Sequence, residues 1–145
     1  MAGTTMAAAK SALKTMTSKA VGAGVLVTYG DPGELARTEC IYIGAAVDNS
    51  HDPVALRSGP RMRDEDYTVN IHVEVSSKGT PEATEARAVV LGTAIETAIA
   101  ADPKLLNTTN VLWAVVSGMS LDTSQTSEAP RTVLEIAVTV KARLV

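Results

Sequence analysis

Aromatic side chains are scarce in this chain, which has no Phe, one Trp and three Tyr among its 145 residues. Proteins that bind single-stranded nucleic acids stack the bases on such rings, so this class of function is poorly supported. Apolar residues still make up 46% of the chain, an ordinary share for a folded domain. We therefore expect a core built from Val, Ile, Leu, Ala and Met.

Cysteine, excess positive charge and long apolar runs are also lacking. The single Cys40 excludes an internal disulfide and a cysteine-based zinc site, and its place in the aliphatic run 39–45 predicts a buried, inert thiol. The net charge of -3 provides no overall attraction for the phosphate backbone of nucleic acids. No apolar segment approaches the ~18–20 residues of a membrane-spanning helix, so no membrane partner is expected.

A chain of this length predicts one domain, here 1–145, and its first 22 residues predict a helix. Thr4 or Thr5 is suited to cap this helix, and the glycines in 22–24 are suited to end it. Apolar residues recur along it at steps of three and four, which indicates one buried stripe: Met6, Ala9, Leu13, Met16 and Ala20. Strands are predicted at 25–29 and 37–46.

Residues 47–66 are predicted to form a long charged loop. Loops longer than about 12–15 residues in compact domains are usually functional or disordered, so this loop is the first candidate for a contact surface. It contains a block of mixed charge made of Arg57, Arg61, Arg63, Asp64, Glu65 and Asp66. Two interpretations stay open: a solvated loop whose charges satisfy one another, or a polar interface between subunits.

The second half of the chain predicts a strand at 67–75, a helix at 81–101, and strands at 110–116 and 132–144. Strict alternation in 67–75 places Tyr67 and the aliphatic residues on one face and His72 and Glu74 on the other. Thr80 and Pro81 suit the start of the helix. The side of this helix expected to be buried is a narrow stripe of mostly small residues: Ala83, Ala86, Val90, Ala94 and Ala98. Leu91 and Ile95 flank this stripe. The polar segment 122–130 is predicted to be a hairpin tip.

The expected order is therefore helix, three strands, helix, two strands, and the fold class is α+β with a mainly antiparallel sheet of about five strands. No catalytic constellation stands out, and we expect neither an enzyme nor a cofactor. Gly22-Ala23-Gly24 precedes a strand instead of linking a strand to a helix, so it is no dinucleotide fingerprint. His72 and Glu74 could share a metal ion, but spacing identifies no third ligand. The rival hypothesis is a small α+β ligand-binding dimer or enzyme that uses His51, His72 and Glu74.

Three segments together resemble the tail terminator proteins of long-tailed, siphovirus-type bacteriophages, especially those infecting actinobacteria. They are the run R-M-R-D-E-D-Y at 61–67 with the following strand, the helix 81–101 with Asp102-Pro103-Lys104-Leu105 after it, and the closing strand 133–144. The resemblance spans about 25–145. The N-terminal helix and the tip at 122–130 carry no motif of that family.

The resemblance implies a virion protein assembled in the host cytoplasm and located at the tail or neck. Such subunits are expected to form a ring, as a hexamer, that caps the tail tube, stops its polymerisation and joins the tail to the neck or connector. The implied partners are copies of this chain, the tail tube protein and the neck proteins, while DNA passes through the lumen without specific binding. Self-association is expected to use sheet edges, the block 57–66 and one helix face. Another neck or head–tail completion subunit is the alternative within the same class.

Overall fold

The computed structural model describes residues 3–33, 38–53, 63–76, 79–125 and 129–144. Two helices and five strands follow one another in the expected order, which confirms the α+β fold class. They are α1 (Met6–Val21), β1 (Leu26–Thr28), β2 (Glu39–Pro53), β3 (Arg63–Ser76), α2 (Pro81–Ala101), β4 (Val111–Gln125) and β5 (Pro130–Leu144).

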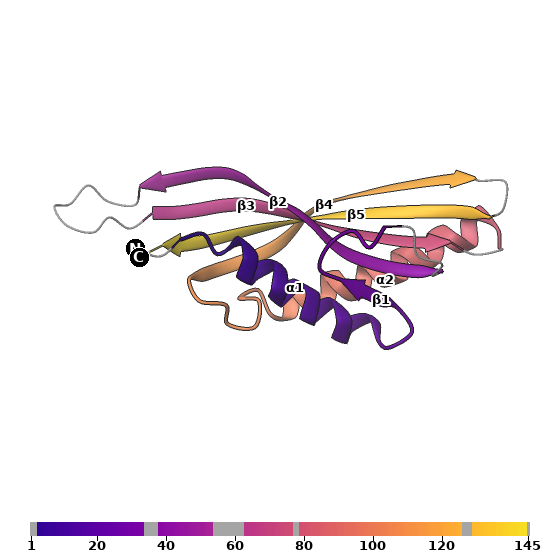
Figure 1. Ribbon diagram of the computed structural model, residues 1–145, viewed down its shortest axis with the longest axis horizontal. Helices are drawn as coiled ribbons and strands as arrows, with labels where there is room; N and C mark the ends of the chain where they lie inside the picture. The colour runs from indigo at the N-terminus through magenta and orange to yellow at the C-terminus, as the bar shows by residue number, and fades with distance from the viewer. Residues whose placement is uncertain (1–2, 34–37, 54–62, 77–78, 126–128, 145) are drawn as a thin grey trace.

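All the strands form one sheet with the order β1-β2-β3-β5-β4. Only the pair β1–β2 is parallel, and the other pairs are antiparallel. The long strands cross one another in projection because the sheet is strongly twisted, as expected for chains of L-residues (Figure 1). Both helices lie on the same side of the sheet (Figure 1). We call this side the helix-covered face and the opposite side the uncovered face.

The core lies between the sheet and the two helices. The predicted alternation in β3 is confirmed, since Tyr67, Val69, Ile71, Val73 and Val75 are all buried. The same period of two is found in β5, where Leu134, Ile136, Val138, Val140 and Ala142 are buried and the residues between them are half-buried. Aliphatic side chains thus supply the burial that drives folding, at about 25 cal/mol per Å² of apolar surface. Cys40 is buried as predicted.

The end of α1 and the start of α2 follow the local sequence signals, whereas Thr5 at the start of α1 makes no side-chain capping hydrogen bond. α1 stops at Val21, and Gly22 takes a φ of 82°, a left-handed conformation that glycine adopts without strain. Thr80 caps α2 by accepting a hydrogen bond from the backbone N–H of Ala83 at 3.2 Å, and Pro81 occupies the first turn.

The buried stripe of α2 differs from the predicted one. Ala83, Ala86 and Val90 are exposed, and the buried residues are Thr84, Ala88, Leu91, Gly92, Ile95 and Ile99. The helix carries small or apolar residues all round, so its periodicity could not identify the packed side. The close contact at Gly92 identifies the packed side of the helix. A Cβ at this position would lie 2.4 Å from Leu134 Cδ2, so this point of α2 lies against β5.

The expected loop at 47–66 is shorter than predicted, because β2 continues to Pro53 and β3 already begins at Arg63. The polar hairpin tip at 122–130 is also shortened, because 122–125 belong to β4 and Pro130 begins β5. Both segments are rich in polar residues, and for this reason they were predicted to be loops. Side chains on the uncovered face of an edge strand can be polar, so polarity alone does not mark a turn.

Candidate assembly surfaces

The side chains of the charged block that belong to β3 point alternately to the two faces of the sheet. Arg57 and Arg61 lie outside the described residues, whereas Arg63 to Asp66 form the first residues of β3. Asp64 lies on the uncovered face and accepts two hydrogen bonds from Arg143 of β5, at 2.8 and 3.2 Å. Asp66 accepts one from the side-chain amide of Asn49 at 3.3 Å. Two of the predicted interface carboxylates therefore already have partners within the subunit.

Glu65 points to the opposite side and is fully buried. Its Oε1 accepts hydrogen bonds from the backbone N–H and the hydroxyl of Thr5, both at 2.9 Å. The hydroxyls of Thr5 and Tyr67 are 2.8 Å apart, and because the single Thr5 hydroxyl proton goes to Glu65, Tyr67 donates. Burial raises the pKa of Tyr67 to about 12, and the nearby Glu65 charge acts in the same direction. The expectation that Glu65, as part of the block 57–66, lies at a subunit interface is therefore corrected, since this buried carboxylate anchors the start of α1 to the sheet.

The pair Asp64–Arg143 predicts a pH effect on stability. The hydrogen bonds from Arg143 lower the pKa of Asp64, so the pair stabilises the fold above the ordinary carboxyl pKa and loses this contribution as pH falls through the lowered pKa. Asp64→Asn should cost about 0.5 kcal/mol at neutral pH, in the range of exposed ion pairs. Urea unfolding at pH 7 and at about pH 3 measures this, and the difference between wild type and variant should shrink at the lower pH. An unchanged difference would contradict the assignment.

The rival site does not assemble as a ligand cluster. His72 stacks on Tyr42, with ring centroids 4.6 Å apart, and Glu74 binds Arg131 at 2.7 Å. A Cβ on Gly44 would lie 2.9 Å from the His72 ring, so glycine at this β2 position makes room for the ring. His51 belongs to β2, but its side chain lies outside the description. Within the described ranges, no three or more His, Cys, Asp or Glu side chains are grouped so that they could hold a metal ion.

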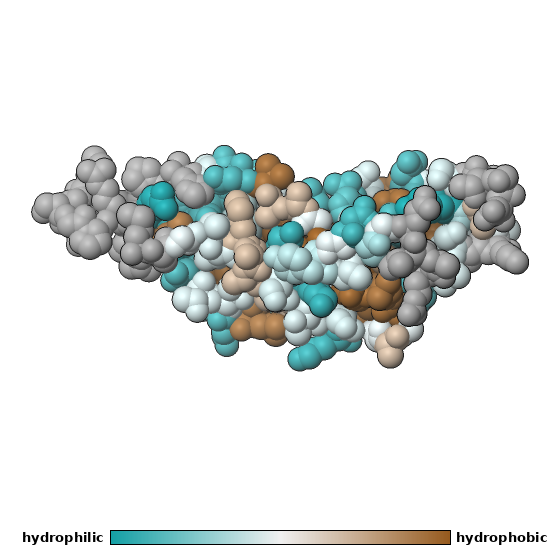
Figure 2. Space-filling view, in the orientation of Figure 1, coloured by the Kyte–Doolittle hydropathy of each residue, from teal (hydrophilic) through white to brown (hydrophobic). Residues whose placement is uncertain are grey.

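The outer strand β4 exposes a set of large apolar side chains that the sequence reading did not single out. These residues are 37–48% exposed: Leu112, Trp113, Val115, Met119 and Leu121. The register places Trp113 and Val115 on the uncovered face, opposite Lys141 and Thr139, while Met119 pairs with the core-facing Ile136. Met119 and Leu121 are two residues apart, as expected for one face of a strand, and this spacing could have predicted that the strand continues. Gly118 interrupts the apolar alternation before them and obscured this signal. In Figure 2 the visible face carries small apolar patches between polar ones.

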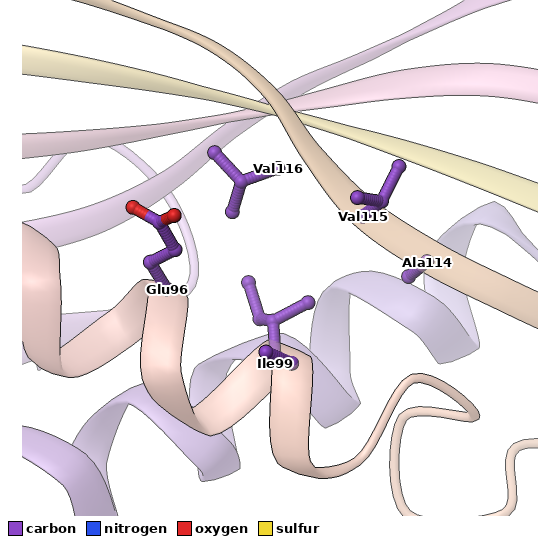
Figure 3. A pocket seen from close by; sticks show the side chains of 6 residues that line it. Glu96, Ile99, Ala114, Val115 and Val116 are labelled. Carbon is purple, nitrogen blue, oxygen red and sulfur yellow. The ribbon is translucent and has the colours of Figure 1, made fainter.

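A small cavity of about 90 Å³ lies between α2 and β4. Figure 3 shows Glu96 and Ile99 reaching from the helix toward Ala114 and Val116 of the strand. Pockets for small-molecule ligands usually measure about 300–1,000 Å³, so this cavity holds a few water molecules at most. Its place next to the exposed apolar residues of β4 makes it part of the same surface.

Among the described residues, neither helix is both long and apolar enough to cross a lipid bilayer.

Comparison with solved structures shows a likeness of fold. A chain of a solved structure described as "Virion of native gene transfer agent (GTA) particle" shares the fold, with a TM-score of 0.56 and 10% sequence identity. The match covers 93% of this chain and 94% of that chain. No family profile matches the sequence. No curated protein matches it either.

Proposed function

We propose that the protein is a structural component of a phage-like virion and that it acts as a tail terminator. In this role several copies, six by the family resemblance, form a ring on the end of the tail tube. The ring stops further polymerisation of the tube and joins the tail to the neck. DNA passes through its lumen without specific binding.

The observation that carries the proposal is the fold shared with a chain of a gene transfer agent virion. The likeness extends over 93% of one chain and 94% of the other, so it concerns the whole subunit and not a common supersecondary motif. The long exposed apolar edge of β4 supports assembly as well, because isolated soluble proteins usually protect such edges.

The charged block remains part of the proposed interface in a reduced form. Arg63 and Asp66 lie at one end of β3 and are half-buried, next to the segment that holds Arg57 and Arg61. We assign polar contacts between subunits, or with the tube, to Arg57, Arg61 and Arg63. Asp64 is not assigned such a contact, because it already pairs with Arg143 of the same subunit.

The decisive experiment is to produce particles with and without this protein and to measure tail length in negative-stain images. Without a terminator, tubes should grow well beyond the length that wild-type tails share, and added purified protein should restore uniform tails that join capsids. Tails of normal length that fail to join capsids would overturn the terminator role and indicate another neck or completion subunit. Particles that assemble normally would overturn the virion role itself.

A further inference from the structure

Among the described residues, no strand pairs with the outer side of β4 or of most of β2, and these two edges differ in character. β1 pairs with β2 only at Cys40–Tyr42, so within the described ranges no strand covers the outer side of Ile43–Pro53. On the other edge, no described strand pairs with the outer side of β4. Natural sheets usually protect edges with charges or proline. The β2 edge has such residues in Asp48, Asp52 and Pro53, whereas the segment 111–121 of β4 has no charged residue and no proline.

Strand direction allows these two edges to meet in a regular ladder. The pairs β2–β3, β3–β5 and β5–β4 are all antiparallel, so β4 runs opposite to β2. A neighbouring copy related by rotation about an axis roughly along the strands would therefore place its β2 antiparallel to β4. The ladder would continue from subunit to subunit with the helices always on the same side. Because the two edges differ, this contact is heterologous, and a ring results when the rotation between neighbouring copies divides a full turn.

The side chains on the two edges also correspond. Val47 pairs with Thr68, Thr68 pairs with Thr139, and Thr139 pairs with Val115, so these four residues form one row across the uncovered face. The row ends in an exposed valine on each edge: the exposed fraction is 53% for Val47 and 48% for Val115. If the ladder continues without a shift, Val115 of one copy lies beside Val47 of the next, an apolar cross-strand pair.

The helix-covered side adds area to the contact. Glu85 of α2 accepts a hydrogen bond from Thr123 of β4, and Glu96 lines the cavity beside β4. Val89 lies four residues after Glu85 on the same flank of the helix, and it is exposed, as are Met119 and Leu121. A ladder along Ile43–Pro53 is about 36 Å long and about 10 Å deep, or roughly 360 Å². Stable interfaces bury about 800 Å² per partner, so this apolar flank is needed to complete the contact.

We propose that β4 of one copy pairs antiparallel with the outer edge of β2 of the next copy, with Val115 near Val47, so that the sheets of the ring form one continuous ladder. This inference rests on the proposed ring but specifies which surfaces form it. Closed sheets need a stagger between strands, so a shifted register is tested beside the unshifted one.

Cysteine cross-linking tests the pairing in a Cys40→Ala background. Val47→Cys and Val115→Cys are made separately and together, and Trp113→Cys with Val47→Cys samples a register shifted by two residues. After mild oxidation of the purified protein and of assembled tails, the double variant that matches the register of the contact should yield a series of covalent multimers up to the ring size. A mixture of the two single variants should form dimers and nothing larger, because each subunit carries one cysteine and the first disulfide uses it.

The matched control replaces Val115→Cys by Val90→Cys, at a valine of α2 that is 56% exposed and lies about 100° around the helix from Val89. Combined with Val47→Cys, it should not form multimers. Dimers of Val115→Cys alone, as abundant as those of the mixture, would overturn the proposal in favour of a two-fold β4–β4 contact. Absence of cross-links in every combination would overturn it as well. These outcomes are independent of tail length, so the edge contact can fail while the terminator role stands, and the reverse.

Discussion

Replacing Glu65 by alanine is expected to lower the free energy of unfolding by about 3 kcal/mol, because a hydrogen bond to a charged group contributes about 1.5–3 kcal/mol and the two from Thr5 are lost. Both bonds come from Thr5, and their loss leaves a buried N–H and hydroxyl without their acceptor. Urea unfolding measures the loss. Hydrogen exchange of the amide of Ala9, which donates to the Thr5 carbonyl at the start of α1, should become faster.

Two further variants test whether the loss comes from the hydrogen bonds between Thr5 and Glu65 or from removing a negative charge. Glu65→Gln keeps a carbonyl oxygen that can accept from Thr5, so it should cost less than Glu65→Ala. Asp66→Ala removes the neighbouring carboxylate, which is half-buried on the uncovered face and accepts one hydrogen bond from Asn49. A loss for Glu65→Ala no larger than that for Asp66→Ala would refute the anchoring role.

Gly92→Val is expected to destabilise the protein by about 2 kcal/mol, within the range of about 1–3 kcal/mol for overpacked cores. The new Cβ alone would lie 2.4 Å from Leu134 Cδ2, and both residues are buried between α2 and β5. Valine favours the helix over glycine by a few tenths of a kcal/mol, which offsets only part of this cost. The midpoint of urea unfolding gives the measurement.

The control for this contact lies one residue further along the helix. Thr93 is exposed, so Thr93→Val should change stability by less than about 0.5 kcal/mol. Combining Gly92→Val with Leu134→Ala should cost less than the sum of the two single changes, because the smaller side chain makes room for the valine. Strict additivity would show that Gly92 and Leu134 do not limit the approach of α2 to the sheet.

Local patterns in the sequence were sufficient for much of the fold. The alternation in 67–75 and 132–144 identified the inner strands and their buried faces, since one side chain in two must face the helices. The signals at Thr80-Pro81 and at Gly22 placed helix ends correctly, because capping depends on a few neighbouring residues. Fold class and element order follow from these features together.

The candidate surface was only partly predictable. Sheet edges were expected to take part in self-association, yet the extension of β4 to Gln125 was missed. Arg63, Asp64, Glu65 and Asp66 were treated as one charged loop, although the strand directs Glu65 to the helix-covered side and Asp64 to the other. A run of charges has no period that reveals which members are paired within the chain.

The sequence by itself determined the aliphatic core, the alternating faces of β3 and β5, the end of α1 and both ends of α2, because each depends on interactions over a few residues. Only the tertiary structure decided which stripe of α2 is packed, which carboxylate is buried, and which valines end the same row of the sheet. These features depend on residues far apart in the chain, such as Gly92 against Leu134 and Thr5 against Glu65. Close packing and the pairing of buried polar groups select among the arrangements that local pattern leaves equivalent.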